Sequence, residues 1–254
     1  MRILISNDDG IGAPGIDALV RAFSGAGHEL TVVAPDGQRS AASHSVTIEG
    51  EIAVERREFP GAARAFAVRG TPADCVKIGL RTLAPDCEFV LTGINRGYNI
   101  GVDVLYSGTV GAAMEGALAG CPAMAVSLGK RREDHYDLAA EQALSLFEML
   151  VRHPLPPLCM ANLNIPETDR VEGLVATSLR PLRYDDAYTL ARREGGVDYY
   201  RLGGWIEEDG APGDDDLTWL QRGCATLTIL SYDMAQHEQT RAWRACLDSA
   251  HPAI

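Results

Sequence analysis

Cysteine, basic charge and long apolar runs are all scarce in this sequence, and each shortage argues against a class of protein. The six cysteines lie far apart without a Cys-x-x-Cys pair, so a fold stapled by disulfides is not expected. Lysine and arginine total 23 against 35 aspartates and glutamates, a net charge of −12, which argues against a nucleic-acid polymer as partner. No apolar run approaches the roughly 20 residues that cross a membrane, so no membrane partner is expected.

What the sequence does have is 254 residues, 46% hydrophobic and 23% charged, enough for one substantial core with appendages. The opening residues MRILIS lead directly into an acidic loop, without the apolar region and cleavage site of a signal peptide. Because the cysteines are also interpreted as reduced, mostly buried thiols, we expect a cytoplasmic protein.

The first half of the chain alternates short apolar, β-branched runs with helical patterns, which is typical of a parallel sheet covered on both faces. Strands are expected at Arg2–Ser6, Glu29–Ala34, Ala65–Val68, Glu88–Thr92 and Ala123–Leu128. Helices are expected at about Pro14–Ser24, Pro72–Leu83 and Gly108–Ala119. Right-handed connections between these elements predict a doubly wound α/β fold.

The second half begins regularly and then changes character. A helix at about Asp137–Arg152 and a strand at Leu158–Ile165 complete a predicted core of residues 1–165. The remainder, 166–254, is predicted to form an extension used in oligomer contacts. It has irregular, glycine-containing hairpins between about 170 and 210, an acidic helix-capping turn at Asp214–Asp216, a short helix through Gln221, a strand at Ala225–Leu230 and a terminal helix near Gln236–Leu247.

Polar residues gather where three of the predicted strands end. Asn7-Asp8-Asp9-Gly10 follows the first strand, a loop with Ser40 follows the second, and Asn95 follows the strand that ends at Thr92. In an open parallel sheet these ends converge on one crevice. Two carboxylates, a hydroxyl and an amide form an oxygen ligand set for Mg²⁺, Mn²⁺ or Ca²⁺. Taken alone, the aspartate pair is equally consistent with an ordinary turn.

The stretch Ser107-Gly108-Thr109 is a loop that enters a helix of small residues. Free backbone N–H groups and the helix dipole make such a junction an anion site, although a plain N-cap has the same sequence. The glycine-rich run from Gly93 to Gly101 permits close approach to a ligand, and within it we assign Asn99 to the phosphate site as well.

Each of five further side chains has both a functional interpretation and an ordinary structural one. A proton donor or substrate contact is possible at one histidine, but a lone loop histidine is more often incidental. Two arginines either pair with phosphate or form surface ion pairs. Two tyrosines either stack on a nucleotide base or pack against other side chains of the protein. The residues are His44, Arg39, Arg96, Tyr98 and Tyr106.

Other families with an acidic loop after the first strand fit less well. A receiver domain needs an aspartate where this chain has Asn95, and a haloacid-dehalogenase-like phosphatase needs Asp-x-Asp instead of the adjacent Asp8 and Asp9. A glycosyltransferase or a nucleotide-binding protein without hydrolysis stays open on fold alone.

The sequence resembles the SurE family of survival proteins over nearly its whole length. The most specific shared motifs are Ile3-Leu4-Ile5-Ser6-Asn7-Asp8-Asp9-Gly10 and Tyr106-Ser107-Gly108-Thr109-Val110. Further shared segments are Val33-Ala34-Pro35-Asp36 with Arg39-Ser40, Gly70-Thr71-Pro72-Ala73-Asp74-Cys75-Val76, Gly93-Ile94-Asn95 with Gly97 and Asn99, Ala113-Met114-Glu115-Gly116, and Asn162-Leu163-Asn164-Ile165-Pro166. The region from Val171 to Gly210 matches only loosely.

This resemblance implies a metal-dependent 5'-nucleotidase that hydrolyses nucleoside monophosphates, with possible 3'-nucleotidase and exopolyphosphatase activity. It implies one divalent metal ion held by Asp8, Asp9, Ser40 and Asn95, and a phosphate-contacting loop at Ser107–Thr109. It further implies a Rossmann-like core with a protruding C-terminal portion, assembled as a homodimer or homotetramer. The alternative hypothesis is a regulatory protein that binds nucleotides without turnover.

Overall fold

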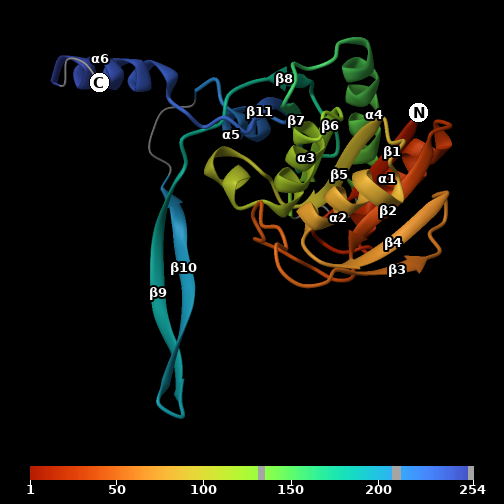
Figure 1. Ribbon diagram of the computed structural model, residues 1–254, viewed down its shortest axis with the longest axis horizontal. Helices are drawn as coiled ribbons and strands as arrows, with labels where there is room; N and C mark the ends of the chain where they lie inside the picture. Colours follow the sequence, from red (N-terminus) through yellow and green to blue (C-terminus); the bar gives the residue numbers. More distant parts are fainter. Residues whose placement is uncertain (131–134, 208–212, 251–254) are drawn as a thin grey trace.

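The computed structural model describes residues 1–130, 135–207 and 213–250, and its main body is a mixed sheet of nine strands covered by helices (Figure 1). The strand order is β3-β4-β2-β1-β5-β6-β7-β11-β8. The central strands run parallel to one another; they are β4 (Arg64–Arg69), β2 (Glu29–Pro35), β1 (Arg2–Ser6), β5 (Phe89–Arg96), β6 (Ala123–Leu128) and β7 (Cys159–Ile165).

The strands at the two edges break this parallel pattern. β3 (Ala53–Arg57) pairs antiparallel with β4 at one edge. At the other edge β11 (Ala225–Ser231) runs antiparallel to β7, and β8 (Leu174–Ala176) joins β11. Both predicted parts of the chain, 1–165 and 166–254, therefore contribute strands to one sheet.

Helices cover both faces of the sheet, because its central strands are apolar on both sides. α1 (Pro14–Gly25) and α4 (Tyr136–Arg152) pack on one face. There the Phe147 ring meets Phe23 and Phe89 edge to face, with ring centroids 5.3 and 4.9 Å apart. α2 (Pro72–Ile78) and α3 (Gly108–Leu118) cover the other face. α3 consists largely of small residues, so it packs close to the strands.

The predicted doubly wound fold is confirmed, and two of its elements end several residues away from the predicted position. β5 continues to Arg96 instead of ending at Thr92, because its pairing with β6 shifts register and resumes at Asn95. α2 ends at Ile78, earlier than expected, and a π-helical turn spans Gly79–Leu83. The glycine at the junction is a poor helix former, which explains why the helical pattern overstates the length of α2.

Two short edge strands escape prediction from the sequence. β3 reads Ala-Val-Glu-Arg-Arg, and its charged half is exposed, so it lacks the apolar alternation of a buried strand. β8 is only three residues long. Both gain their strand conformation from a neighbour in the sheet, which a local pattern does not reveal.

A long hairpin projects from the body (Figure 1). It consists of β9 (Arg183–Glu194) and β10 (Val197–Glu207), joined at Gly195 and Gly196, whose φ angles of 58° and 80° suit a tight hairpin turn. The protruding arm is thus confirmed as a single hairpin, with Gly203 and Gly204 inside β10.

Two further helices follow the arm. α5 (Asp216–Gln221) begins at an N-cap, Asp215, whose side chain accepts a hydrogen bond from Thr218 N, as the acidic turn predicted. α6 (His237–Ala250) is the terminal helix and lies away from the sheet (Figure 1). Within the described ranges, none of the helices has the length and apolar character needed to traverse a membrane.

Candidate functional site

The carboxyl ends of β1 and β5 lie side by side at the centre of the sheet. β1 pairs with β2 on one side and β5 on the other, and the helices that follow β1 and β5 pack on opposite faces. Because the two connections leave toward opposite faces, a crevice opens at the strand ends between them, and this is where ligands bind in sheets of this kind. Asp8 and Asp9 follow β1, and Asn95 is at the end of β5. The structure therefore brings these three residues to the same crevice.

Asn7 shapes the loop that carries the two aspartates. Its buried side chain donates from Nδ2 to Gly10 O at 2.8 Å and accepts from Gly10 N at 3.2 Å. This pair of hydrogen bonds closes a tight turn around Asp8 and Asp9. No role is predicted for Asn7 in the sequence, although an asparagine three positions before a glycine is a turn signal that identifies it.

Asp8 is buried against the start of α3. Its Oδ1 accepts a hydrogen bond from the Thr109 hydroxyl at 2.5 Å. A Cβ at Gly108 would come within 2.9 Å of the Asp8 Cβ, so the approach depends on glycine. Burial raises the pKa of Asp8 to about 6, and the charge of Asp9 adds to this rise, while the hydrogen bonds from Thr109 oppose it.

Asp9 is half-buried beside Asp8, and its Oδ2 accepts a hydrogen bond from Arg96 N at 3.2 Å. Burial raises the pKa of Asp9 as well, although the hydrogen bond and the positive charge of Arg96 oppose the rise. Two adjacent carboxylates with raised pKa values are under-compensated anions. A cation bound between them would compensate the negative charge of both carboxylates.

Asn95 and Ser40 supply neutral oxygens near the aspartates. Asn95 Nδ2 donates to Gly97 O at 2.8 Å, which turns the amide oxygen away from that carbonyl. Ser40 is exposed on the loop after β2, and its hydroxyl accepts from Gln38 Nε2 at 2.8 Å. The same loop reaches the β1 loop through Arg39, whose N donates to Asp8 O at 2.7 Å.

This donor set fits a hard divalent cation. Carboxylate, amide and hydroxyl oxygens are preferred by Mg²⁺, Mn²⁺ and Ca²⁺, and the raised pKa values of Asp8 and Asp9 mark a place where positive charge is needed. Over residues 1–130, 135–207 and 213–250 there is no group of three or more His, Cys, Asp or Glu placed to hold a metal ion. A metal in the crevice would therefore depend on the neutral oxygens as well as the two carboxylates.

The start of α3 lies against Asp8. Ser107 Oγ accepts from Val110 N at 3.1 Å, so this hydroxyl is the N-cap that the simpler interpretation predicts. Thr109 donates to Asp8 from its hydroxyl. The amide of Gly108 belongs to the first turn, whose N–H groups have no partner within the helix. The helix thus directs its positive end into the crevice.

Asn99 lies in a buried network of amides behind the crevice. Its Nδ2 donates to Ser127 Oγ at 2.7 Å, and its backbone N donates to Asn164 Oδ1 at 2.8 Å. Its carbonyl oxygen accepts from the side chains of Asn162 and Asn164 at 2.9 and 3.0 Å. This network holds the glycine-rich loop in place, and a phosphate contact by Asn99 stays a prediction.

The structure favours the simpler interpretation for an arginine and a tyrosine. Arg39 pairs with Asp36 at 3.1 Å on the surface. The Tyr98 hydroxyl accepts from Glu167 N at 3.0 Å, and burial raises the pKa of Tyr98 to about 12. Tyr106, by contrast, is 58% exposed.

His44 contacts a buried carboxylate, Glu115 of α3, that the sequence does not identify as functional. His44 Nε2 lies 2.8 Å from Glu115 Oε1, and Lys77 Nζ lies 3.0 Å from Oε2. Burial acts to raise the pKa of Glu115, but the hydrogen bonds from His44 and Lys77 outweigh it and hold that pKa below its ordinary value.

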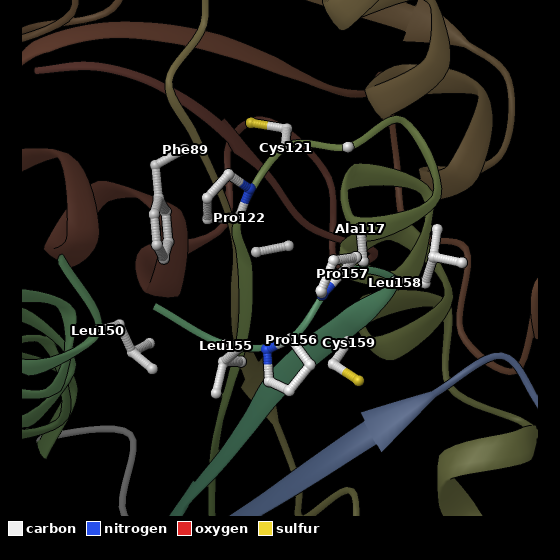
Figure 2. A pocket seen from close by; sticks show the side chains of 12 residues that line it. Phe89, Ala117, Cys121, Pro122, Leu150, Leu155, Pro156, Pro157, Leu158 and Cys159 are labelled. Carbon is white, nitrogen blue, oxygen red and sulfur yellow. The ribbon is translucent and has the colours of Figure 1, made fainter. Parts of the chain in front are cut away.

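Two cavities at opposite ends of the sheet differ in their chemistry. One of about 240 Å³ lies at the amino ends of β5, β6 and β7. Figure 2 shows that apolar side chains such as Phe89, Leu155 and Pro156 line it, together with the thiols of two cysteines. The other, of about 480 Å³, is at the carboxyl ends and is lined by small residues together with Asp9, Asp36, Gln38 and Arg96. Only the second has charged groups for an ionic substrate.

Comparisons with known proteins identify the family and the fold that this chain resembles. The family model for survival protein SurE matches residues 3–186. The 5'-nucleotidase SurE of Synechococcus elongatus is 42% identical over 248 residues, covering 93% of this chain and 96% of the relative. That of Heliobacterium modesticaldum is 40% identical over 241 residues, covering 93% and 88%. The crystal structure of a SurE protein from Aquifex aeolicus matches with a TM-score of 0.83 at 28% identity, covering 98% of this chain and all 100% of the other.

Proposed function

This chain belongs to the SurE family, and from that membership and the geometry of the crevice we propose that it hydrolyses nucleoside monophosphates to nucleoside and phosphate with the help of a divalent metal ion. The observation that carries the proposal is the pair of partly buried carboxylates, Asp8 and Asp9, at the strand ends beside the start of a helix. Relatives with about 40% identity are named 5'-nucleotidases, which supports the substrate class.

The metal would be held by Asp8, Asp9, Ser40 and Asn95, with Mg²⁺ or Mn²⁺ as the working ion and Ca²⁺ as a possible occupant. When bound, such an ion offsets charge on phosphoryl oxygens and makes water a better nucleophile. The carboxylates hold the charge that makes the site selective for a cation. The two neutral residues complete the ligand set without adding further negative charge beside an anionic substrate.

The protein's own groups bind and orient the phosphate and move one proton. The amide of Gly108 and the positive end of α3 attract the phosphate, as helix N-termini do. Water attacks phosphorus in line with the departing nucleoside oxygen, so no covalent enzyme intermediate is needed. Asp8 or Asp9 accepts the proton of that water, since each carboxylate has a second oxygen. The departing nucleoside oxygen takes up one proton as its bond to phosphorus breaks, which returns the carboxylate to its charged form and gives the free nucleoside.

The deciding experiment is phosphate release from a panel of 5'- and 3'-mononucleotides and polyphosphate. Mg²⁺ and Mn²⁺ are added singly to protein that has been stripped with a chelator. We expect release from 5'-mononucleotides with either metal and none in excess chelator, with activity restored when the metal is returned. The 3'-mononucleotide and polyphosphate arms measure the broader activities. Full activity in excess chelator contradicts the metal proposal.

The rival proposal, a nucleotide-binding regulatory protein, gives a different result in the same panel. It predicts that nucleotides bind, as measured by calorimetry, while no phosphate is released with any metal. The carboxylates of Asp8, beside the start of α3, and of its neighbour Asp9 favour metal-dependent hydrolysis, because a binding site for an anion gains nothing from buried negative charge unless a cation is present.

We also propose that the arm joins copies of this chain into a homodimer or homotetramer. In the register of β9 and β10, Tyr188 faces Leu202 and Leu190 faces Tyr200. Residues paired in this way point to the same side of a hairpin, so these four side chains form one apolar face. They are between 43% and 67% exposed. A second copy would bury the apolar face, whereas the opposite side of the hairpin carries polar pairs such as Thr189 with Arg201.

A further inference from the structure

The segment 39–44, which carries Ser40, is held at both of its ends. At one end Arg39 N donates to Asp8 O at 2.7 Å. At the other, Ser43 donates to two backbone oxygens of the loop before α3, from its N at 3.0 Å and from its Oγ at 2.5 Å. Ser40 therefore lies on a short bridge between the β1 loop and the approach to α3.

His44 fastens the second end to the helix itself. Its Nε2 lies 2.8 Å from Oε1 of Glu115, which is only 8% exposed. The backbone lies against α3 as well, since a Cβ at Gly111 would come within 3.0 Å of His44 Cα. The other oxygen of Glu115 is 3.0 Å from Lys77 Nζ on α2. A buried carboxylate thus links the bridge to two helices.

The bridge has a backbone conformation that it would not adopt unaided. Ala41 and Ser43 have φ angles of 56° and 54°, in the left-handed region that residues other than glycine seldom occupy. Such residues persist where the surrounding contacts impose the conformation. Because Ala41 directly follows Ser40 and Ser43 directly precedes His44, release of the His44 end would let both relax and would shift the Ser40 hydroxyl.

We propose that Glu115 is a positioning residue for the cation site: through His44 it holds the bridge on α3 and so keeps Ser40 near the β1 loop, which the bridge contacts at Asp8. This inference rests on the proposed function, because it concerns the affinity of the same metal site. Groups that orient metal ligands change metal affinity about 10- to 100-fold when they are removed. Lys77 offers a matched control, since it binds the same carboxylate from α2 and is not part of the bridge.

The test measures the dissociation constant of Mn²⁺ by electron paramagnetic resonance on the full chain without nucleotide. His44→Ala is expected to raise this constant about tenfold. His44→Gln, whose amide can still donate to Glu115, restores most of the affinity. Lys77→Ala stays within about twofold of wild type, as expected for an exposed partner. The thermal unfolding temperatures of the two alanine variants should fall by similar small amounts. If Glu115 had only a structural role, the two substitutions would therefore change Mn²⁺ affinity alike.

The same measurement on protein that already carries Ser40→Ala tests whether the loss of Mn²⁺ affinity acts through Ser40. If Glu115 acts through Ser40, His44→Ala adds no further loss there, and the two substitutions are non-additive. An unchanged constant in His44→Ala, an equal loss in Lys77→Ala, or a full additional loss in the Ser40→Ala background overturns the inference and leaves the proposed function standing. A wild-type protein that binds no Mn²⁺ overturns the metal site itself, and the inference with it.

Discussion

At the scale of single residues, Asp8 and Asp9 combine burial, like charge and hydrogen bonds in one small loop. Asp8→Asn and Asp9→Asn should each abolish phosphate release, because each removes a negative charge that a cation needs. The fold should persist, since an asparagine oxygen at position 8 can still accept from Thr109. Phosphate release and circular-dichroism melting measure the two effects. Asp86→Asn, at a surface ion pair with Arg2, is the matched control and should stay active; wild-type turnover in either site variant would refute the assignment.

Asp74 is one residue through which acid should weaken the protein. It caps α2 with Thr71 and accepts from Thr47 N and Oγ1 at 2.8 and 2.7 Å. Burial alone would raise the pKa of Asp74, but these hydrogen bonds outweigh it and lower that pKa from its ordinary value of 3.8. The stabilisation is therefore present above pH 3.8 and is lost as the pH falls through the lowered value.

Asp74→Asn should lower the free energy of unfolding by about 1–3 kcal/mol at pH 7. The difference from wild type should shrink below the ordinary pKa of 3.8, where the wild-type carboxyl also becomes neutral. Urea unfolding at pH 7 and pH 3 measures both quantities. A difference that is equal at the two pH values would show that charge has no part in the effect.

At the scale of an element, α3 couples the core to the crevice, because its first turn lies against Asp8 and its later turns pack on the sheet. Gly108→Ala would bring a Cβ within 2.9 Å of Asp8 Cβ and 3.0 Å of Pro72 Cγ, so the helix start must shift. A misplacement of this kind costs about 100-fold in kcat. Steady-state kinetics measures the loss. Gly25→Ala, which meets nothing within 4 Å, is the control, and an unchanged kcat for Gly108→Ala would show that the close approach is dispensable.

At the scale of the whole molecule, the arm and the terminal helix lie apart from the sheet, and the apolar face of the arm is uncovered (Figure 1). Tyr200→Ser combined with Leu202→Ser should convert the oligomer to monomer, because it removes half of that face. Light scattering coupled to gel filtration measures the mass. Arg201→Ser, between them on the opposite side of β10, should leave the mass unchanged. A wild-type monomer, or a serine variant that keeps its oligomeric mass, would contradict the assembly proposal.

Local patterns in the sequence are enough to predict the order and type of most elements. Apolar runs and helix start signals are local, so the strand over Ala123–Leu128 and the helix starts at Pro14 and Pro72 are correct from pattern alone. The sequence also placed Asp8, Asp9 and Asn95 near one another, because the rule for strand ends in a parallel sheet needs only the order of the strands.

The contacts between side chains in the site depend instead on how distant elements pack together. Thr109 donates to Asp8 across 101 positions of sequence, and His44 meets Glu115 across 71, so neither contact follows from a local pattern. The apolar face of the arm depends on the pairing of β9 with β10, and a shift by one residue would send its side chains to the other side. Local periodicity specifies elements, whereas the site arises from register and packing between elements that are distant in the chain.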